Sequence, residues 1–169
     1  MSLKNNAVQW LTQKTRATID AWVAKYPPDK KRSAVLSALH AAQEQNEGWL
    51  STELIAAVAA YLGLPTIQVY EVATFYDMYE RQLCGKHKIR ICTNIACMLQ
   101  GSDHIVDRVK QCLRIDFGES TPDRQFMLKE AQCLAACAGA PMMQIDNQYY
   151  EHLTPETVSE ILTAWKPAR

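Results

Sequence analysis

Lys88-Ile-Arg-Ile-Cys92-Thr-Asn-Ile-Ala-Cys97 is the stretch that decides the fold of the second half of the chain. Its first five residues alternate between charged and apolar side chains, which is typical of a half-buried strand. Such a strand would end on Cys92, and Cys97 follows in a segment of mostly small residues. The sequence therefore predicts a strand that delivers two thiols to one end of a sheet.

A second pair of thiols follows after 35 intervening residues, in Cys133-Leu-Ala-Ala-Cys137. The spacing of the four residues is C-x4-C…C-x3-C, and four thiolates suit a soft metal centre, above all an iron-sulfur cluster. Small neighbours leave backbone amides free to donate to sulfur. Neither segment contains a lysine or arginine that could compensate the cluster's negative charge instead.

Three other interpretations of the cysteines remain open. Structural zinc usually takes C-x2–4-C knuckles, often with a histidine at matching spacing, and neither segment contains a histidine. Six cysteines could form disulfides, but nothing resembles a secretory signal, so we expect a reducing compartment. Unligated buried thiols are the usual state of scattered cysteines, and we predict this state for Cys84 and Cys112.

The spacing also separates the classes of iron-sulfur site. A plant-type ferredoxin needs a third cysteine at position 100, which is Gln100, and the bacterial type needs C-x2-C-x2-C. A Rieske centre needs two histidine ligands near the cysteines, whereas the four histidines are scattered along the chain. These comparisons favour a 2Fe-2S cluster held by four cysteines.

Composition describes an ordinary globular chain. The 169 residues are 48% hydrophobic and 21% charged, enough for one good core or two small ones. The formal net charge is zero, so the chain lacks the excess of positive charge that is typical of proteins that bind nucleic acid or an anionic membrane. No stretch approaches the roughly 18 apolar residues of a spanning helix, and Met1–Asn6 resembles neither a signal peptide nor a presequence. We expect no nucleic-acid partner and no direct membrane insertion.

The first half of the chain is predicted to be helical. Apolar residues recur at three-to-four spacing before Pro27-Pro28 and again in residues 35–42, while Ser51 and Gly63 are suited to begin and end a third helix. A fourth helix would follow Pro65 and extend to Tyr79. An aromatic stripe at helical spacing is more often core than docking surface, so we predict that Thr74, Phe75 and Tyr76 are buried, and we leave Glu71 open.

The second half has the order β-α-β-β-α. Gly101-Ser102 begins its first helix, residues 125–129 and 142–145 form two further strands, and Thr154-Pro155-Glu156 begins the last helix. The fold class is therefore α+β, with an N-terminal helical bundle over residues 1–82 and a thioredoxin-like α/β domain over residues 83–169. Both cysteine pairs follow strand ends, so one edge of the sheet can gather all four thiols.

Taken together, these residues closely resemble the small thioredoxin-like ferredoxin subunit of NADH:quinone oxidoreductase, the NuoE type. The resemblance covers nearly the whole chain from about Lys30. It rests on the following motifs: Glu71-Val-Ala-Thr-Phe-Tyr76, Cys92-x4-Cys97 with Leu99-x-Gly101-Ser102, Gly118-Glu-Ser-Thr121, Cys133-Leu-x2-Cys137-x2-Ala140-Pro141-Met142, Tyr149-Tyr150-Glu151 and Leu153-Thr-Pro-Glu156.

The resemblance implies a 2Fe-2S cluster held by Cys92, Cys97, Cys133 and Cys137. It also implies that the chain takes single electrons from the FMN of a partner flavoprotein of the NuoF type, which oxidises NADH within the peripheral arm of respiratory complex I. The chain would then be part of an NADH dehydrogenase without catalytic residues of its own. Its location would be cytoplasmic, peripheral on the bacterial inner membrane through the complex.

The chain departs from the family pattern at two positions. Many relatives have Glu-Cys-Leu-Gly where this chain has Gln132-Cys133-Leu134-Ala135. Gln132 removes a negative charge, and Ala135 is expected to resist a positive φ because of its Cβ.

An alternative is that the chain is the related subunit of an NAD-reducing hydrogenase or of an NAD-dependent formate dehydrogenase. A structural zinc module and a freely diffusing ferredoxin are alternatives of other classes.

Overall fold

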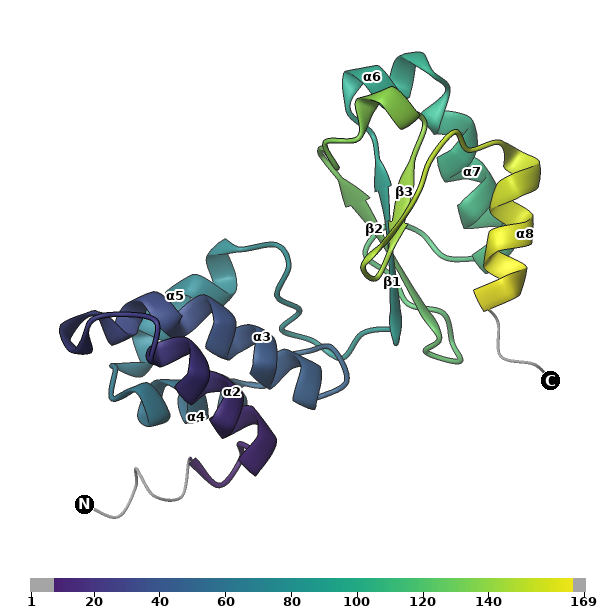
Figure 1. Ribbon diagram of the computed structural model, residues 1–169. Coiled ribbons are helices and arrows are strands. Elements are labelled where there is room, and N and C mark those ends of the chain that lie inside the picture. The colour runs from purple at the N-terminus through teal and green to yellow at the C-terminus, as the bar shows by residue number, and fades with distance from the viewer. Residues whose placement is uncertain (1–7, 166–169) are drawn as a thin grey trace. The chain divides into compact units, whose positions relative to one another are not determined.

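The computed structural model describes residues 8–165 (Figure 1), so the predictions for Met1–Asn6 and for the start of the helical bundle lie outside the described residues. The chain divides into two compact units, one ending at Leu83 and the other beginning at Cys84. Each unit has its own hydrophobic core. No helix in residues 8–165 combines the length and the apolar character that a bilayer span requires.

The first unit is helical, as the sequence predicts. Its elements are α2 (Gln13–Val23), the 3-10 helix η1 (Pro28–Ala34), α3 (Val35–Gln45), α4 (Thr52–Leu62) and α5 (Thr66–Phe75). Ser51 begins α4, because its Oγ accepts a hydrogen bond from Leu54 N at 3.2 Å. Gly63 ends the same helix with a φ of 70°, a conformation that glycine adopts without steric cost.

The predicted length and burial of the fourth helix are wrong. The helix α5 ends at Phe75, and the chain beyond it is held by the buried amide of Gln43, which donates to Met78 O and accepts from Glu80 N. Glu71, Thr74, Phe75 and Tyr76 are all exposed. Only Val69 and Ala73 of α5 are fully buried, and Val72 is partly buried against the same core.

The second unit is a four-stranded sheet with helices, and it confirms the mixed α+β fold class. Its elements are β1 (His87–Cys92), α6 (Ile95–Leu99), α7 (Ser102–Leu113), β2 (Phe126–Ala131), the 3-10 helix η2 (Cys137–Gly139), β3 (Met143–Ile145), β4 (Gln148–Tyr150) and α8 (Pro155–Trp165). The strand order is β2-β1-β3-β4. Sequence patterns did not reveal α6 and β4, because elements of three to five residues are too short to display a period.

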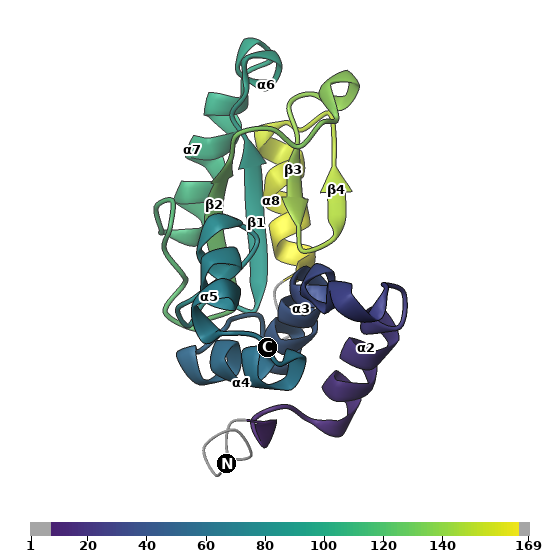
Figure 2. The same cartoon turned by 90° about the vertical axis from the view of Figure 1, so that its left-hand side faces the viewer.

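The core of this unit lies between the sheet and two helices. Figures 1 and 2 show α7 and α8 side by side on one face of the sheet. The central strand β1 contributes Ile89 and Ile91, which pack with apolar residues of both helices. Met142 and Met143 are buried, as predicted for side chains that fill core gaps.

Strand pairing brings the two cysteine segments to the same end of the sheet. The strands β1 and β2 are parallel, and Cys92 lies opposite Ala131 at their carboxyl ends. The chain after β1 forms α6, and the chain after β2 leads to η2. Both short helices lie beyond that end of the sheet (Figures 1 and 2).

Two glycines of the second unit allow a test of this pairing. A Cβ on Gly85 would lie 2.3 Å from the backbone carbonyl carbon of Phe126, at the start of the β1–β2 pair, whereas a Cβ on Gly118 would meet nothing within 4 Å. Gly118 has a φ of 84°, so Gly118→Ala should cost about 1–2 kcal/mol. Gly85→Ala has to displace a strand and should cost about 3 kcal/mol or more. Urea unfolding measures both losses, and equal losses would contradict this strand packing.

Candidate metal centre

Cys92 is fixed by the end of the central strand. It is the last residue of β1 and is 3% exposed. Its backbone N–H donates to Met142 O at 3.3 Å, and the next residue, Thr93, donates to Ala131 O at 3.1 Å. The backbone that carries this thiol is therefore bonded on both sides.

Cys97 is brought next to Cys92 by the short helix α6. Asn94 begins this helix, because its side-chain oxygen accepts from Ile95 N at 2.8 Å. Cys97 is 1% exposed, and burial, followed by its hydrogen bond with Cys92, raises the pKa of its thiol to about 11, although a hydrogen bond from the Met142 amide acts in the opposite direction. A metal that binds here has to displace a firmly held proton.

Cys133 and Cys137 lie on an exposed segment after β2. Cys133 lies outside any helix or strand, and its Sγ accepts a hydrogen bond from Ala135 N at 3.3 Å. Ala135 has a φ of 59°, so the expectation that this alanine would resist a positive φ is wrong. The loop takes the conformation that suits a donor to sulfur, at the cost of backbone strain.

Two polar side chains outside the cysteine pairs, neither of them predicted as a site residue, fasten the second segment in place. Asn94 donates from Nδ2 to Gln132 O at 2.8 Å, so the residue that begins α6 also holds the approach to Cys133. The Tyr149 hydroxyl donates to Leu134 O at 3.0 Å. Asparagine directly before a helix is a recognisable sequence signal, but its second partner is distant in the sequence and only the fold reveals it.

The end of the second segment packs closely on the chain after β4. His152 N donates to Gly139 O at 2.7 Å, and Leu153 N donates to Pro141 O at 3.0 Å. A Cβ on Gly139 would lie 2.6 Å from the Cβ of Glu151. Position 139 therefore requires glycine, because any side chain there would collide with Glu151.

The structure brings three of the four predicted ligands into one neighbourhood. The charges of Cys92 and Cys137 act on Cys97, and Cys92 and Cys97 pack with Met142 in a small apolar cluster. Cys133 reaches the same end of the sheet on its exposed loop. Within residues 8–165, no three His, Cys, Asp or Glu side chains lie close enough to hold a metal ion. Binding would therefore require the thiols to move closer together.

The donor set nevertheless suits an iron-sulfur cluster. All six cysteines lie in the described part of the chain and none is in a disulfide there; Cys84 is buried, Cys112 is half-buried, and neither belongs to the two closely spaced pairs. The four remaining thiols lie at and just beyond the carboxyl ends of β1 and β2, and backbone amides already donate to Cys97 and Cys133. Thiolate ligands with amide donors to sulfur are what such a cluster requires.

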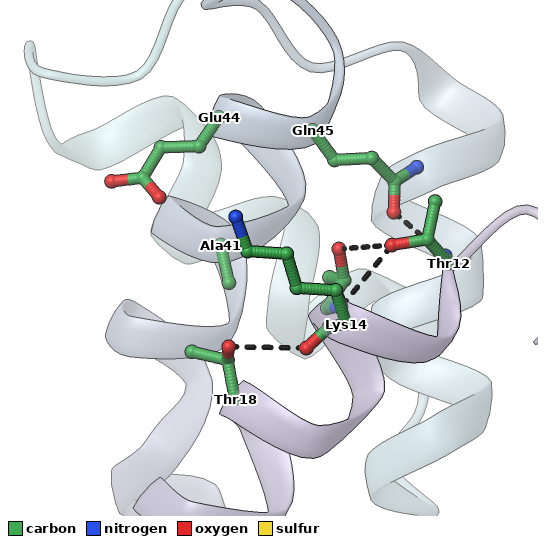
Figure 3. A pocket seen from close by; sticks show the side chains of 7 residues that line it. Thr12, Lys14, Thr18, Ala41, Glu44 and Gln45 are labelled. Atoms are coloured by element: carbon green, nitrogen blue, oxygen red, sulfur yellow. Dashed lines mark hydrogen bonds between the residues drawn. The ribbon is translucent and has the colours of Figure 1, made fainter.

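A separate hollow of about 290 Å³ lies between α2 and α3 in the helical unit (Figure 3). It is lined by Thr12, Lys14, Thr15, Thr18, Ala41, Glu44 and Gln45. Several of its polar groups already bond to one another: Thr12 N donates to Gln45 Oε1 at 2.8 Å, and the Thr12 and Thr15 hydroxyls are 2.9 Å apart. The bond to Gln45 fastens the start of α2 to α3, and the hydroxyl pair lies within the first turn of α2, so we interpret the hollow as a structural feature.

Comparison with known proteins gives concordant matches. A family described as thioredoxin-like 2Fe-2S ferredoxin matches residues 19–166. The E subunit of NADH-quinone oxidoreductase from Rickettsia bellii (strain RML369-C) is 47% identical over 140 residues, which cover 83% of this chain and 84% of that protein. NADH dehydrogenase (ubiquinone) flavoprotein 2, mitochondrial, of Dictyostelium discoideum is 40% identical over 151 residues, 89% of this chain and 61% of that protein.

A solved structure, the NAD+-reducing NiFe hydrogenase in the air-oxidized state, matches with a TM-score of 0.66 and 19% identity. The match covers 79% of this chain and 23% of the hydrogenase chain. At this identity the match shows a shared fold.

The strain at Ala135 leads to a stability prediction. Ala135→Gly should stabilise the chain by about 1 kcal/mol, because glycine adopts a positive φ without the steric cost of a Cβ. Ala136→Gly is the matched control: Ala136 has a φ of −114° and packs on the apolar cluster, so its replacement should destabilise by a similar amount. Thermal unfolding measures both, and a loss of stability in Ala135→Gly would contradict the described loop conformation.

Proposed function

The chain belongs to the thioredoxin-like 2Fe-2S ferredoxin family, and from this premise we propose that it is the electron-transfer subunit of an NADH:quinone oxidoreductase. Its relatives carry the names of NADH-quinone oxidoreductase and NADH dehydrogenase subunits. The observation that carries the proposal is the parallel pairing of β1 and β2, which delivers both cysteine loops to one end of the sheet.

Four thiolates, those of Cys92, Cys97, Cys133 and Cys137, hold the cluster in this proposal. When bound, a 2Fe-2S cluster supplies a site that takes and gives one electron at a time. The chain contributes amide donors from Ala135 and Met142, which favour the negative charge on sulfur. The apolar packing around Cys92 and Cys97 limits the access of water to one side of the site.

Hydride chemistry belongs to another subunit. The chain has six glycines and no dinucleotide fingerprint, so it offers no sequence motif for binding NADH. A flavoprotein partner of the NuoF type binds NADH and FMN in this proposal, and the chain takes single electrons from that FMN. The complex is an oxidoreductase, while the chain alone has no catalytic residue.

The surface around the cysteines favours a stable partner over a diffusing acceptor. Residues 91–102 and 131–145 contain all four cysteines and not one charged side chain. On α6, Ile95 and Leu99 are 65% and 76% exposed. Diffusing electron carriers depend on charged steering surfaces, whereas interface cores are poor in charge. Because electron transfer requires a short distance to the cluster, we place the flavoprotein against α6.

The rest of the assignment follows from this partner. We propose that residues 1–82 form a helical domain that adds partner surface, that residues 83–169 form the cluster-binding domain, and that the chain is cytoplasmic, held at the inner membrane only through its complex. A hydrogenase or formate dehydrogenase parent has less support, because the relatives at 40–47% identity carry the NADH dehydrogenase names.

Anaerobic purification followed by iron and sulfide analysis tests the cluster. We expect about two iron and two acid-labile sulfide per chain and a half-spin EPR signal after dithionite reduction. Cys97→Ala and Cys137→Ala should each lose most of the iron, while Cys112→Ala, which removes a thiol outside the four, should retain it. One zinc per chain without sulfide would contradict the proposal and favour a structural zinc module.

Two isoleucines of similar exposure test the docking surface. Ile95→Glu places a charge on α6, and Ile67→Glu does the same on α5, where the side chain is 62% exposed. We expect Ile95→Glu to weaken the binding of the flavoprotein subunit by about tenfold or more, because the charge is desolvated in the interface. Pull-down with the co-expressed flavoprotein measures this. Retained binding in Ile95→Glu together with loss in Ile67→Glu would place the interface on the helical unit.

A further inference from the structure

The four thiols differ sharply in access. Cys92 and Cys97 are almost fully buried, at 3% and 1% exposure, whereas Cys133 and Cys137 are both exposed. Solvent, and any molecule that delivers a cluster, therefore meets one pair of thiols before the other. The two pairs lie on separate segments, with 35 residues of chain between Cys97 and Cys133.

The two pairs also differ in how they are held. Cys92 belongs to the central strand and Cys97 to the helix α6, so the inner pair is fixed by regular secondary structure. Of the outer pair, Cys137 begins the 3-10 helix η2, whereas Cys133 lies in a stretch without regular structure, where Asn94 bonds to Gln132 O and Tyr149 bonds to Leu134 O. Cys133 can therefore move toward an incoming group with little loss of backbone bonding, while Cys137 presents an exposed thiol at the start of η2.

We propose that Cys133 and Cys137 bind the incoming 2Fe-2S cluster first and that Cys92 and Cys97 complete its ligation afterwards. This order rests on the proposed function, since it presumes that the four thiols hold a cluster. The outer pair would draw the cluster onto the face formed by α6, where the inner pair lies beneath the surface. The exposure of both outer thiols, together with the irregular backbone around Cys133, assigns this pair to the first step.

The reaction is ligand exchange without electron transfer. In each step, one thiol of the chain loses its proton and forms a bond to iron, and one thiolate of the donor leaves iron and takes up a proton. Two such steps at Cys133 and Cys137 give a cluster shared between the chain and the donor. Two more at Cys92 and Cys97 release the donor. The oxidation states of iron and sulfur do not change.

The test uses the full chain and a synthetic 2Fe-2S complex with four small thiolate ligands, mixed without oxygen. Native mass spectrometry detects the chain with a cluster and two retained small thiolates, and visible circular dichroism gives the rate of uptake. Cys92→Ala/Cys97→Ala should form this adduct at an initial rate within about twofold of the unmodified chain, because the first step needs only exposed thiols. Cys133→Ala/Cys137→Ala should form it about tenfold more slowly or not at all.

Cys84→Ser/Cys112→Ser is the matched control and should acquire the cluster as the unmodified chain does. A brief treatment of the native, unmodified chain with iodoacetamide gives a measurement that does not depend on the folding of variants. It should alkylate Cys133 and Cys137, as peptide mapping would verify, and abolish adduct formation. Adduct formation through Cys92 and Cys97 in the alkylated chain, or similar initial rates in the two double variants, would overturn the proposed order.

The outcomes separate this proposal from the function on which it rests. Failure of the unmodified chain to acquire any cluster would contradict the proposed function itself. Uptake by the unmodified chain with the opposite order of thiols would leave the function intact and overturn only the order of ligation.

Discussion

The parallel pairing of β1 and β2 is the constraint on which the rest of the second unit depends. Cys92 stands opposite Ala131 at the carboxyl ends of the two strands, so two loops that are far apart in sequence leave the sheet together. A parallel pair cannot be joined by a tight turn, and here the helices α6 and α7 and a loop form the crossover between the strands. The same connection therefore supplies one thiol and covers one face of the sheet.

The loops at this end satisfy two opposing demands. First, their backbone must present N–H groups to sulfur, and in a helix or strand those groups would already be bonded to carbonyl oxygens. Second, the loops must hold their thiols in place. Isolated side-chain bonds meet the second demand, as in the bond from Asn94 to Gln132 O. The positive φ of Ala135 shows the cost of the first, because the donor to Cys133 lies at a strained residue.

The helical unit shows how local patterns mislead where a helix is short. The period that marks α5 continues into Tyr76 and Tyr79, but the helix ends at Phe75. Tyr79 is buried through the bonds that Gln43 makes to the chain beside it, whereas Phe75 is 80% exposed. Periodicity could not separate these two aromatic residues, because their burial depends on a contact 35 residues away in sequence.

The sequence by itself determined the long elements, the mixed fold class and the four candidate ligands, because helix periods, capping residues and cysteine spacing are local properties. It also limited the cluster type, since ligand spacing excludes the common alternatives. The tertiary structure decided which thiols are buried, that β4 completes the sheet, and that Asn94 and Tyr149 join the cysteine loops. Those features depend on contacts between distant residues, and such contacts exist only once the strands have paired.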